Sequence, residues 1–136
     1  MIYDFHPLII HFPIALFTVA IFFDLLFLIF NKNDFFTGGW WTMFFALISS
    51  TVAITTGILD DTFIGHLGSV FPLWLNHGWV QVFSCTVFLF LFMWRTKDKN
   101  IFYDKLKKWV YATAALMSLA ILYYGGHLGA KLSGRI

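Results

Sequence analysis

The segment LIIHFPIALFTVAIFFDLLFLIF, from Leu8 to Phe30, decides the fold of this chain. It contains one charged residue, Asp24, and it is long enough to cross a bilayer, which takes about 20 mostly apolar residues. No Lys or Arg precedes it, no small-residue cleavage site follows it, and it is longer than the apolar part of a signal peptide. We therefore expect a retained membrane span.

The composition extends this expectation to the whole chain. Of its 136 residues, 60% are hydrophobic and 12% are charged, whereas soluble domains have roughly half and a quarter. Backbone groups in lipid must bind one another, which favours helices. The sequence predicts an all-α, integral membrane four-helix bundle with up-down-up-down connections. We expect residues 1–136 to form one domain, with spans near residues 8–30, 39–59, 77–94 and 109–124.

The positive charges predict the orientation. Six of the nine basic residues lie between the third and fourth predicted spans: Arg95, Lys97, Lys99, Lys105, Lys107 and Lys108. Because Lys and Arg are retained on the cytoplasmic side, we expect this loop in the cytoplasm and both termini in the periplasm of a bacterial inner membrane. Topology and anionic lipid account for these lysines, so no nucleic-acid surface is predicted.

A short motif occurs twice. Gly65-His66-Leu67-Gly68 follows the second predicted span, and Gly126-His127-Leu128-Gly129 follows the fourth. His11 and His77 begin the first and third. The pattern favours two similar helical hairpins related by a pseudo-twofold axis along the membrane normal. Four residues are a short match, so unrelated hairpins stay an alternative.

All five histidines fall on the predicted periplasmic side: His6, His11, His66, His77 and His127. Histidine in or beside a span needs a partner or a ligand, and imidazole ligates haem iron, copper, zinc and non-haem iron. Spans one and three are diagonal in such a bundle, as are spans two and four. His11 is therefore expected to face His77, and His66 to face His127, with interfacial hydrogen bonding as the alternative.

Several other polar residues belong to this pattern. Gln81 lies one turn after His77 and is predicted to hydrogen-bond a ligand histidine or a cofactor edge. Asp60 and Asp61 are predicted to orient an imidazole or attract a cation, or else to be solvated. Asp24 stands inside the first span, where it could relay protons, pair with a lysine of the basic loop, or hydrogen-bond to Trp or Thr across the bundle while protonated.

The two ends of the chain carry a family resemblance. His6-Pro7-Leu8-Ile9-Ile10-His11-Phe12-Pro13-Ile14-Ala15-Leu16 resembles the H-P-L-x-x-H-F-P-I-A-L opening of a widespread, uncharacterised family of small four-helix bacterial membrane proteins. The closing segment from Gly126 to Gly134 resembles that family's glycine-rich ending, although Ala130 replaces a glycine and Arg135 stands just past the usual place of a second histidine. Relatives are joined to c-type cytochrome or Rieske domains, which implies a redox setting and favours haem over zinc.

The leading prediction is a b-type haem protein that transfers electrons, with one or two haems ligated by His11, His66, His77 and His127 and with His6 as the substitute. Quinone and a periplasmic c-type cytochrome are the candidate partners, and an electron carrier fits better than an enzyme with its own substrate. The alternatives are a bare Cu, Fe or Zn site that includes Asp60 or Asp61, and a structural or accessory subunit. The oligomeric state, a homo-oligomer included, stays open.

Overall fold

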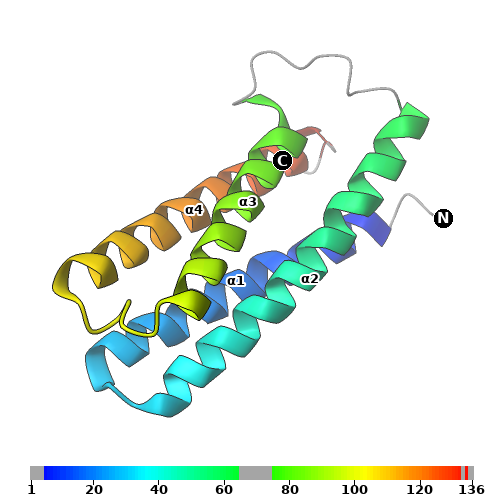
Figure 1. The fold of residues 1–136 in the computed structure, drawn as a ribbon. Helices are drawn as coiled ribbons and strands as arrows, with labels where there is room; N and C mark the ends of the chain where they lie inside the picture. The colour runs from blue at the N-terminus through cyan, green and yellow to red at the C-terminus, as the bar shows by residue number, and fades with distance from the viewer. Residues whose placement is uncertain (1–4, 65–74, 133, 135–136) are drawn as a thin grey trace.

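A computed structural model describes residues 5–64, 75–132 and 134, and the side chains of residues 5–8, 60–64 and 132 lie outside this description. The described chain forms four α-helices and no strand: α1 (Phe5–Phe30), α2 (Asn33–Ile64), α3 (His77–Lys97) and α4 (Lys105–Leu132). They run alternately up and down in a bundle (Figure 1). Each helix is long and apolar enough to cross a membrane, which confirms the predicted fold class.

The helices extend beyond the predicted spans. α2 begins at Asn33 instead of near residue 39, and α4 covers residues 105–132 instead of 109–124. The motif at residues 126–129 therefore lies inside α4 and does not follow it. Its counterpart at residues 65–68 lies outside the described residues, so the internal repeat stays a prediction.

Asparagine residues shape the end of α1 and the start of α3. Asn31 has a φ angle of 51° and donates its backbone N–H to Phe27 O at 2.8 Å, which ends α1. This left-handed conformation is one that Asn tolerates better than most residues. Asn76 caps α3, where its Oδ1 accepts a 3.0 Å hydrogen bond from the N–H of Gly78.

Aspartates organise the loop between α3 and α4. Asp104 Oδ1 accepts 2.9 Å hydrogen bonds from the N–H groups of Lys107 and Leu106, so Asp104 caps α4. The same N–H groups lower the pKa of the Asp104 carboxyl. Asp98 pairs with the Lys107 ammonium at 2.6 Å, and this hydrogen bond lowers the pKa of Asp98. Both carboxylates are thereby kept ionised in a loop that is otherwise basic.

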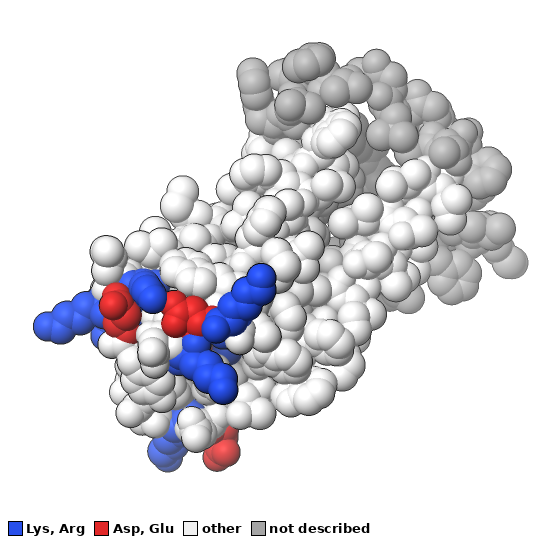
Figure 2. Space-filling model, viewed as in Figure 1, with Lys and Arg blue, Asp and Glu red and all other residues white. Residues whose placement is uncertain are grey.

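The bundle has an apolar middle and two chemically different ends. Phe17 of α1 and Phe88 of α3 are fully buried and stack in the middle with ring centroids 4.1 Å apart, so these diagonal helices meet in the core. Charged side chains gather where α1 joins α2 and where α3 joins α4 (Figures 1 and 2). We call this the lysine end: Lys32, Lys97, Lys99, Lys105, Lys107 and Lys108. The opposite end, with His11, His77 and His127, is the histidine end.

α1 and α2 approach each other closely at Gly39. A Cβ atom built on Gly39 would overlap the Asp24 carboxylate and would lie 3.4 Å from the carbonyl oxygen of Ala20. At the neighbouring Gly38, an added Cβ would meet the Phe23 ring at 3.6 Å, which is an ordinary contact. The two glycines therefore differ in what they tolerate, although both lie in the same helix.

We expect Gly39→Ala to lower the thermal unfolding midpoint in detergent, because overpacking at a tight contact costs about 1–3 kcal/mol. Gly38→Ala is the matched control and should leave the midpoint unchanged or raise it, since Ala favours a helix over Gly by about 1 kcal/mol. Circular dichroism during heating measures both. Equal midpoints for the two variants would contradict the close approach at Gly39.

Candidate functional site

The His77 imidazole is fixed between α3 and α4 at the histidine end. Its Nδ1 lies 2.5 Å from the carbonyl oxygen of Gly125, and the side chain is half-buried. A carbonyl oxygen only accepts, so Nδ1 carries the proton and Nε2 is the acceptor in the neutral ring. The ring also packs on Gly129, where an added Cβ would lie 2.7 Å from its Cε1. Glycine at this position lets α4 accept the ring.

The polar side chains that follow His77 along α3 also bind the backbone of α4. Gln81 Nε2 donates to the carbonyl oxygen of Leu122 at 3.4 Å, and Ser84 Oγ donates to that of Ser118 at 2.7 Å. We call His77, Gln81 and Ser84 the α3 ladder. Gln81 was predicted to support a ligand or a cofactor, and in the structure it joins α3 to α4.

The other histidines lie differently. The side chains of His11 and His127 are exposed. His11 is two residues before the buried Pro13, which on a helix of 3.6 residues per turn places it on roughly the opposite face. His66 and the side chain of His6 lie outside the described residues. The structure therefore brings His77 into an interhelical contact, and the predicted pairs His11–His77 and His66–His127 stay predictions.

The described residues contain no group of three or more His, Cys, Asp or Glu side chains that could hold a metal ion. The side chains of Asp60 and Asp61 are not among those described.

Towards the histidine end, α2 no longer contributes buried side chains to the core. Ala53 is buried, whereas no side chain from residue 54 to residue 59 is, and the end of α2 stands apart from the start of α3 in Figure 1.

A buried ion pair near the lysine end joins the helices. Arg95 Nη1 of α3 lies 2.7 and 2.8 Å from the two carboxylate oxygens of Asp24 in α1. The hydroxyl of Tyr111 in α4 donates to Asp24 Oδ2 at 2.8 Å, and Arg95 Nη2 donates to the carbonyl oxygen of Phe36 in α2 at 3.1 Å. All four helices thus contribute one group to a network around one guanidinium.

Aromatic rings enclose that guanidinium. Arg95 Cζ lies 5.2 Å from the ring centroids of both Phe36 and Phe102, and 5.9 Å from that of Tyr111. Such positions favour a cation over the ring faces. Arg95 is 1% exposed and lies within α3, so its prediction as a loop residue was wrong. Asp24 was predicted to pair with a lysine of the loop, and its partner is instead Arg95 of α3.

The sequence did contain a signal that Arg95 is buried. It lies seven residues after Phe88 and eighteen after His77, which is about two and five helical turns. Arg95 therefore shares the buried face of α3 with Phe88. The positive-inside rule counts basic residues near span ends and does not separate a solvated lysine from a buried arginine.

Comparison with protein families gives one result. Residues 3–136 match the family described as predicted membrane protein (DUF2231). The chain belongs to this family. No curated protein and no solved structure matches this chain. The match covers nearly the whole chain, and a family of membrane proteins agrees with the four apolar helices.

We expect Arg95→Met to destabilise this DUF2231 protein by about 3–5 kcal/mol, because it leaves the Asp24 carboxylate buried without its cation. The double variant Asp24→Leu with Arg95→Met should recover most of that loss, since it removes both charges. Lys97→Met is the control for an exposed neighbour and should change stability by less than about 0.5 kcal/mol. Denaturant unfolding in micelles measures all three. A double variant as unstable as Arg95→Met would show that an unpaired charge is not the cause.

The glycines of α4 also differ in how well they tolerate a side chain. Gly129→Ala should displace the His77 ring and lower the unfolding midpoint, whereas a Cβ on Gly126 would meet Ile14 at an ordinary 3.5 Å. Gly126→Ala is therefore the control and should behave like wild type. NMR of the His77 ring N–H reports directly on its hydrogen bond to Gly125. An unchanged signal in Gly129→Ala would contradict the packing described.

Proposed function

We propose that this protein binds b-type haem at the histidine end and transfers electrons in the bacterial inner membrane. The observation that carries the proposal is the geometry of His77. Its Nδ1–H is held by the carbonyl of Gly125, which leaves Nε2 as the nitrogen for a metal. Histidines that ligate metals usually donate their other ring N–H to a carboxylate or a backbone carbonyl, which fixes the ring and its tautomer.

The second ligand is proposed from helix register. His11 is exposed, and so is His127. His6 stands about five turns before the buried Asp24, so position 6 is in register with the buried face of α1. We therefore favour His6 over His11 as the partner of His77.

The donor set favours haem over a bare metal. Haem needs two axial side chains from the protein, whereas a bare zinc site needs three or four that converge on one point. No group of three potential ligands occurs among the described residues. A bare Cu, Fe or Zn site would therefore depend on His66 and on the side chains of His6, Asp60 and Asp61. Haem with two imidazole ligands supplies reversible one-electron transfer.

The distribution of charge suggests the partners. The basic residues of the lysine end favour the cytoplasmic side, so both termini and the histidine end are proposed to face the periplasm. A redox centre there would exchange electrons with a quinone in the membrane or with a periplasmic c-type cytochrome. No further substrate is required, so the proposed role is that of a carrier.

A structural or accessory membrane subunit is the second candidate, and the α3 ladder favours it. His77, Gln81 and Ser84 each hydrogen-bond a carbonyl oxygen of α4. Polar contacts of this kind join helices in lipid, where apolar surfaces gain little from meeting each other. In this case His77 would have a packing role alone.

His77→Asn separates the two candidates. The Asn amide nitrogen occupies the place of His Nδ1 and can still donate to Gly125, but the variant has no Nε2. We expect wild-type protein from haem-supplied cells to show a Soret band that sharpens on dithionite reduction, with split visible bands. Without haem, His77→Asn should fold equally well and have the same unfolding midpoint as haem-free wild type. From haem-supplied cells it should lose that six-coordinate spectrum.

Two outcomes would contradict the haem proposal. One is a colourless wild-type protein, and the other is an unchanged spectrum in His77→Asn. His11→Asn serves as the matched control, because it makes the same chemical change at an exposed position and should keep the spectrum if His6 is the second ligand. Loss of the spectrum in His11→Asn would return His11 to the ligand set in place of His6.

A further inference from the structure

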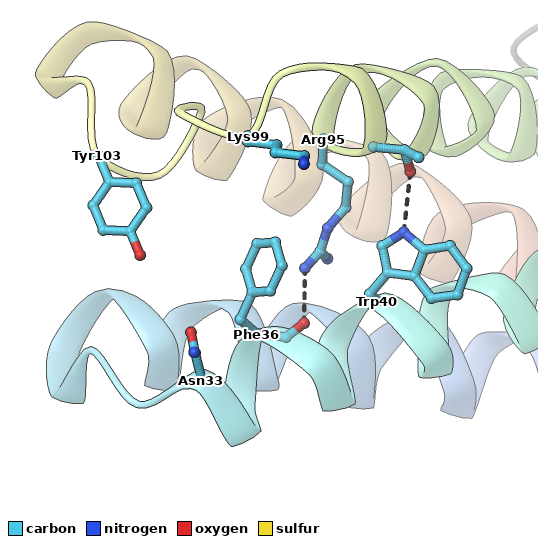
Figure 3. Close-up of a pocket in the computed structure, with 7 residues that line it drawn as sticks. Asn33, Phe36, Trp40, Arg95, Lys99 and Tyr103 are labelled. Atoms are coloured by element: carbon cyan, nitrogen blue, oxygen red, sulfur yellow. Dashed lines mark hydrogen bonds between the residues drawn. The ribbon is translucent and has the colours of Figure 1, made fainter.

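A pocket opens at the lysine end between the start of α2, the end of α3 and the segment that follows α3 (Figure 3). Its volume is about 350 Å³, which falls within the usual range of small-molecule sites, roughly 300–1,000 Å³. Seven residues line it: Asn33, Phe36, Trp40, Arg95, Thr96, Lys99 and Tyr103. The pocket is remote from the histidines and plays no part in the proposed electron transfer.

Polar groups in the pocket are mainly hydrogen-bond donors. The Trp40 Nε1–H is already used, because it donates to Thr96 Oγ1 at 3.0 Å. Within the part of the chain that the structure describes, the side chains of Asn33, Lys99 and Tyr103 form no hydrogen bond or ion pair. An ammonium, an amide and a phenol are thus available to a ligand.

Arg95 adds a buried guanidinium to the lining, and Asp24 balances its charge. Its Nη atoms bind Asp24 and Phe36, while its Nε is the one buried side-chain nitrogen or oxygen without a hydrogen-bond partner among the described residues. A buried donor without a partner is costly. No carboxylate lines the pocket, and the Asp24 carboxylate beside the guanidinium already accepts hydrogen bonds from Arg95 and Tyr111.

This combination selects an anion with several acceptor oxygens. Lys99 supplies a full positive charge without a partner, and the remaining free groups are neutral donors. Phe36, Trp40 and Tyr103 add aromatic walls, which an inorganic ion would not need but the glycerol and first methylenes of a lipid would contact. Trp and Tyr are also the residues that settle at the level of lipid headgroups.

We propose that this pocket binds the phosphate-bearing headgroup of an anionic phospholipid. The Lys99 ammonium pairs with the phosphate, Tyr103 and Asn33 hydrogen-bond its oxygens or the glycerol, and the aromatic walls contact the start of the acyl chains. Basic pockets between helices at the cytoplasmic side of a membrane are suited to such headgroups. The bound lipid would join α2 to the loop after α3 at the membrane surface.

Lys99→Ala and Lys97→Ala form a matched pair for the test. Both remove one exposed lysine from the same end of the bundle, but only Lys99 lines the pocket. Native mass spectrometry of the delipidated full chain in neutral detergent would be used to titrate short-chain phosphatidylglycerol, short-chain phosphatidylcholine and glycerol 3-phosphate. We expect wild type to bind one phosphatidylglycerol, Lys99→Ala to bind it about tenfold more weakly as one charge-assisted hydrogen bond is lost, and Lys97→Ala to match wild type.

Each other outcome overturns the proposal. Equal losses in both variants would mean that the lipid is attracted to the lysine end in general. Equal binding of phosphatidylglycerol and phosphatidylcholine, or no effect of Lys99→Ala, would exclude a headgroup site at this lysine. Glycerol 3-phosphate binding as tightly as the lipid, and depending on Lys99, would assign the pocket to a soluble phosphate ester. None of these readouts depends on whether haem binds at the other end.

Discussion

The ion pair between Arg95 and Asp24 is the contact on which the arrangement of the four helices depends. Helices in lipid gain little from burying apolar surface against each other, so polar contacts and close packing decide their arrangement. Here one guanidinium receives a group from every other helix: the Asp24 carboxylate, the Phe36 carbonyl and the Tyr111 hydroxyl. A single buried charge in a span would be costly, whereas the pair is neutral and multiply hydrogen-bonded. The Asp24 carboxylate also leaves no room for a Cβ atom on Gly39. The spacing of α1 and α2 therefore depends on the ion pair.

α3 connects the two ends of the bundle. Its buried face carries His77, Gln81 and Ser84 towards one end, Phe88 in the middle and Arg95 at the other. The ladder binds the α4 backbone, and Arg95 binds the remaining helices. α2, by contrast, has no buried side chain between residues 54 and 59. Among the side chains that the structure describes, the core towards the histidine end is therefore built mainly from α1, α3 and α4.

The fold could be predicted from the sequence because run length and apolar composition fix membrane helices almost alone. The helix ends could not, since hydropathy falls before the helix stops. The segment from Gly125 to Gly129 is weakly apolar, yet it stays helical because its glycines pack on Gln81 and His77. The partner of Asp24 was also missed. The charge of Arg95 was read as a topology signal, although its register with Phe88 placed it on the buried face.

The candidate site could likewise be predicted only in part from the sequence. Residue type and side of the membrane grouped the histidines, but neither property distinguishes an exposed position from one that contacts another helix. Register does distinguish them: His11 is out of step with Pro13 and exposed, while His77 is in step with Ser84 and Phe88. The structure gives His77 a packing role through Nδ1, and this role is compatible with ligation because it leaves Nε2 unused by the Gly125 contact. Under the haem proposal, the structural and redox functions of this residue would be carried by different atoms of one ring, and a change that removes Nε2 while keeping a donor at Nδ1 would act on the redox function alone.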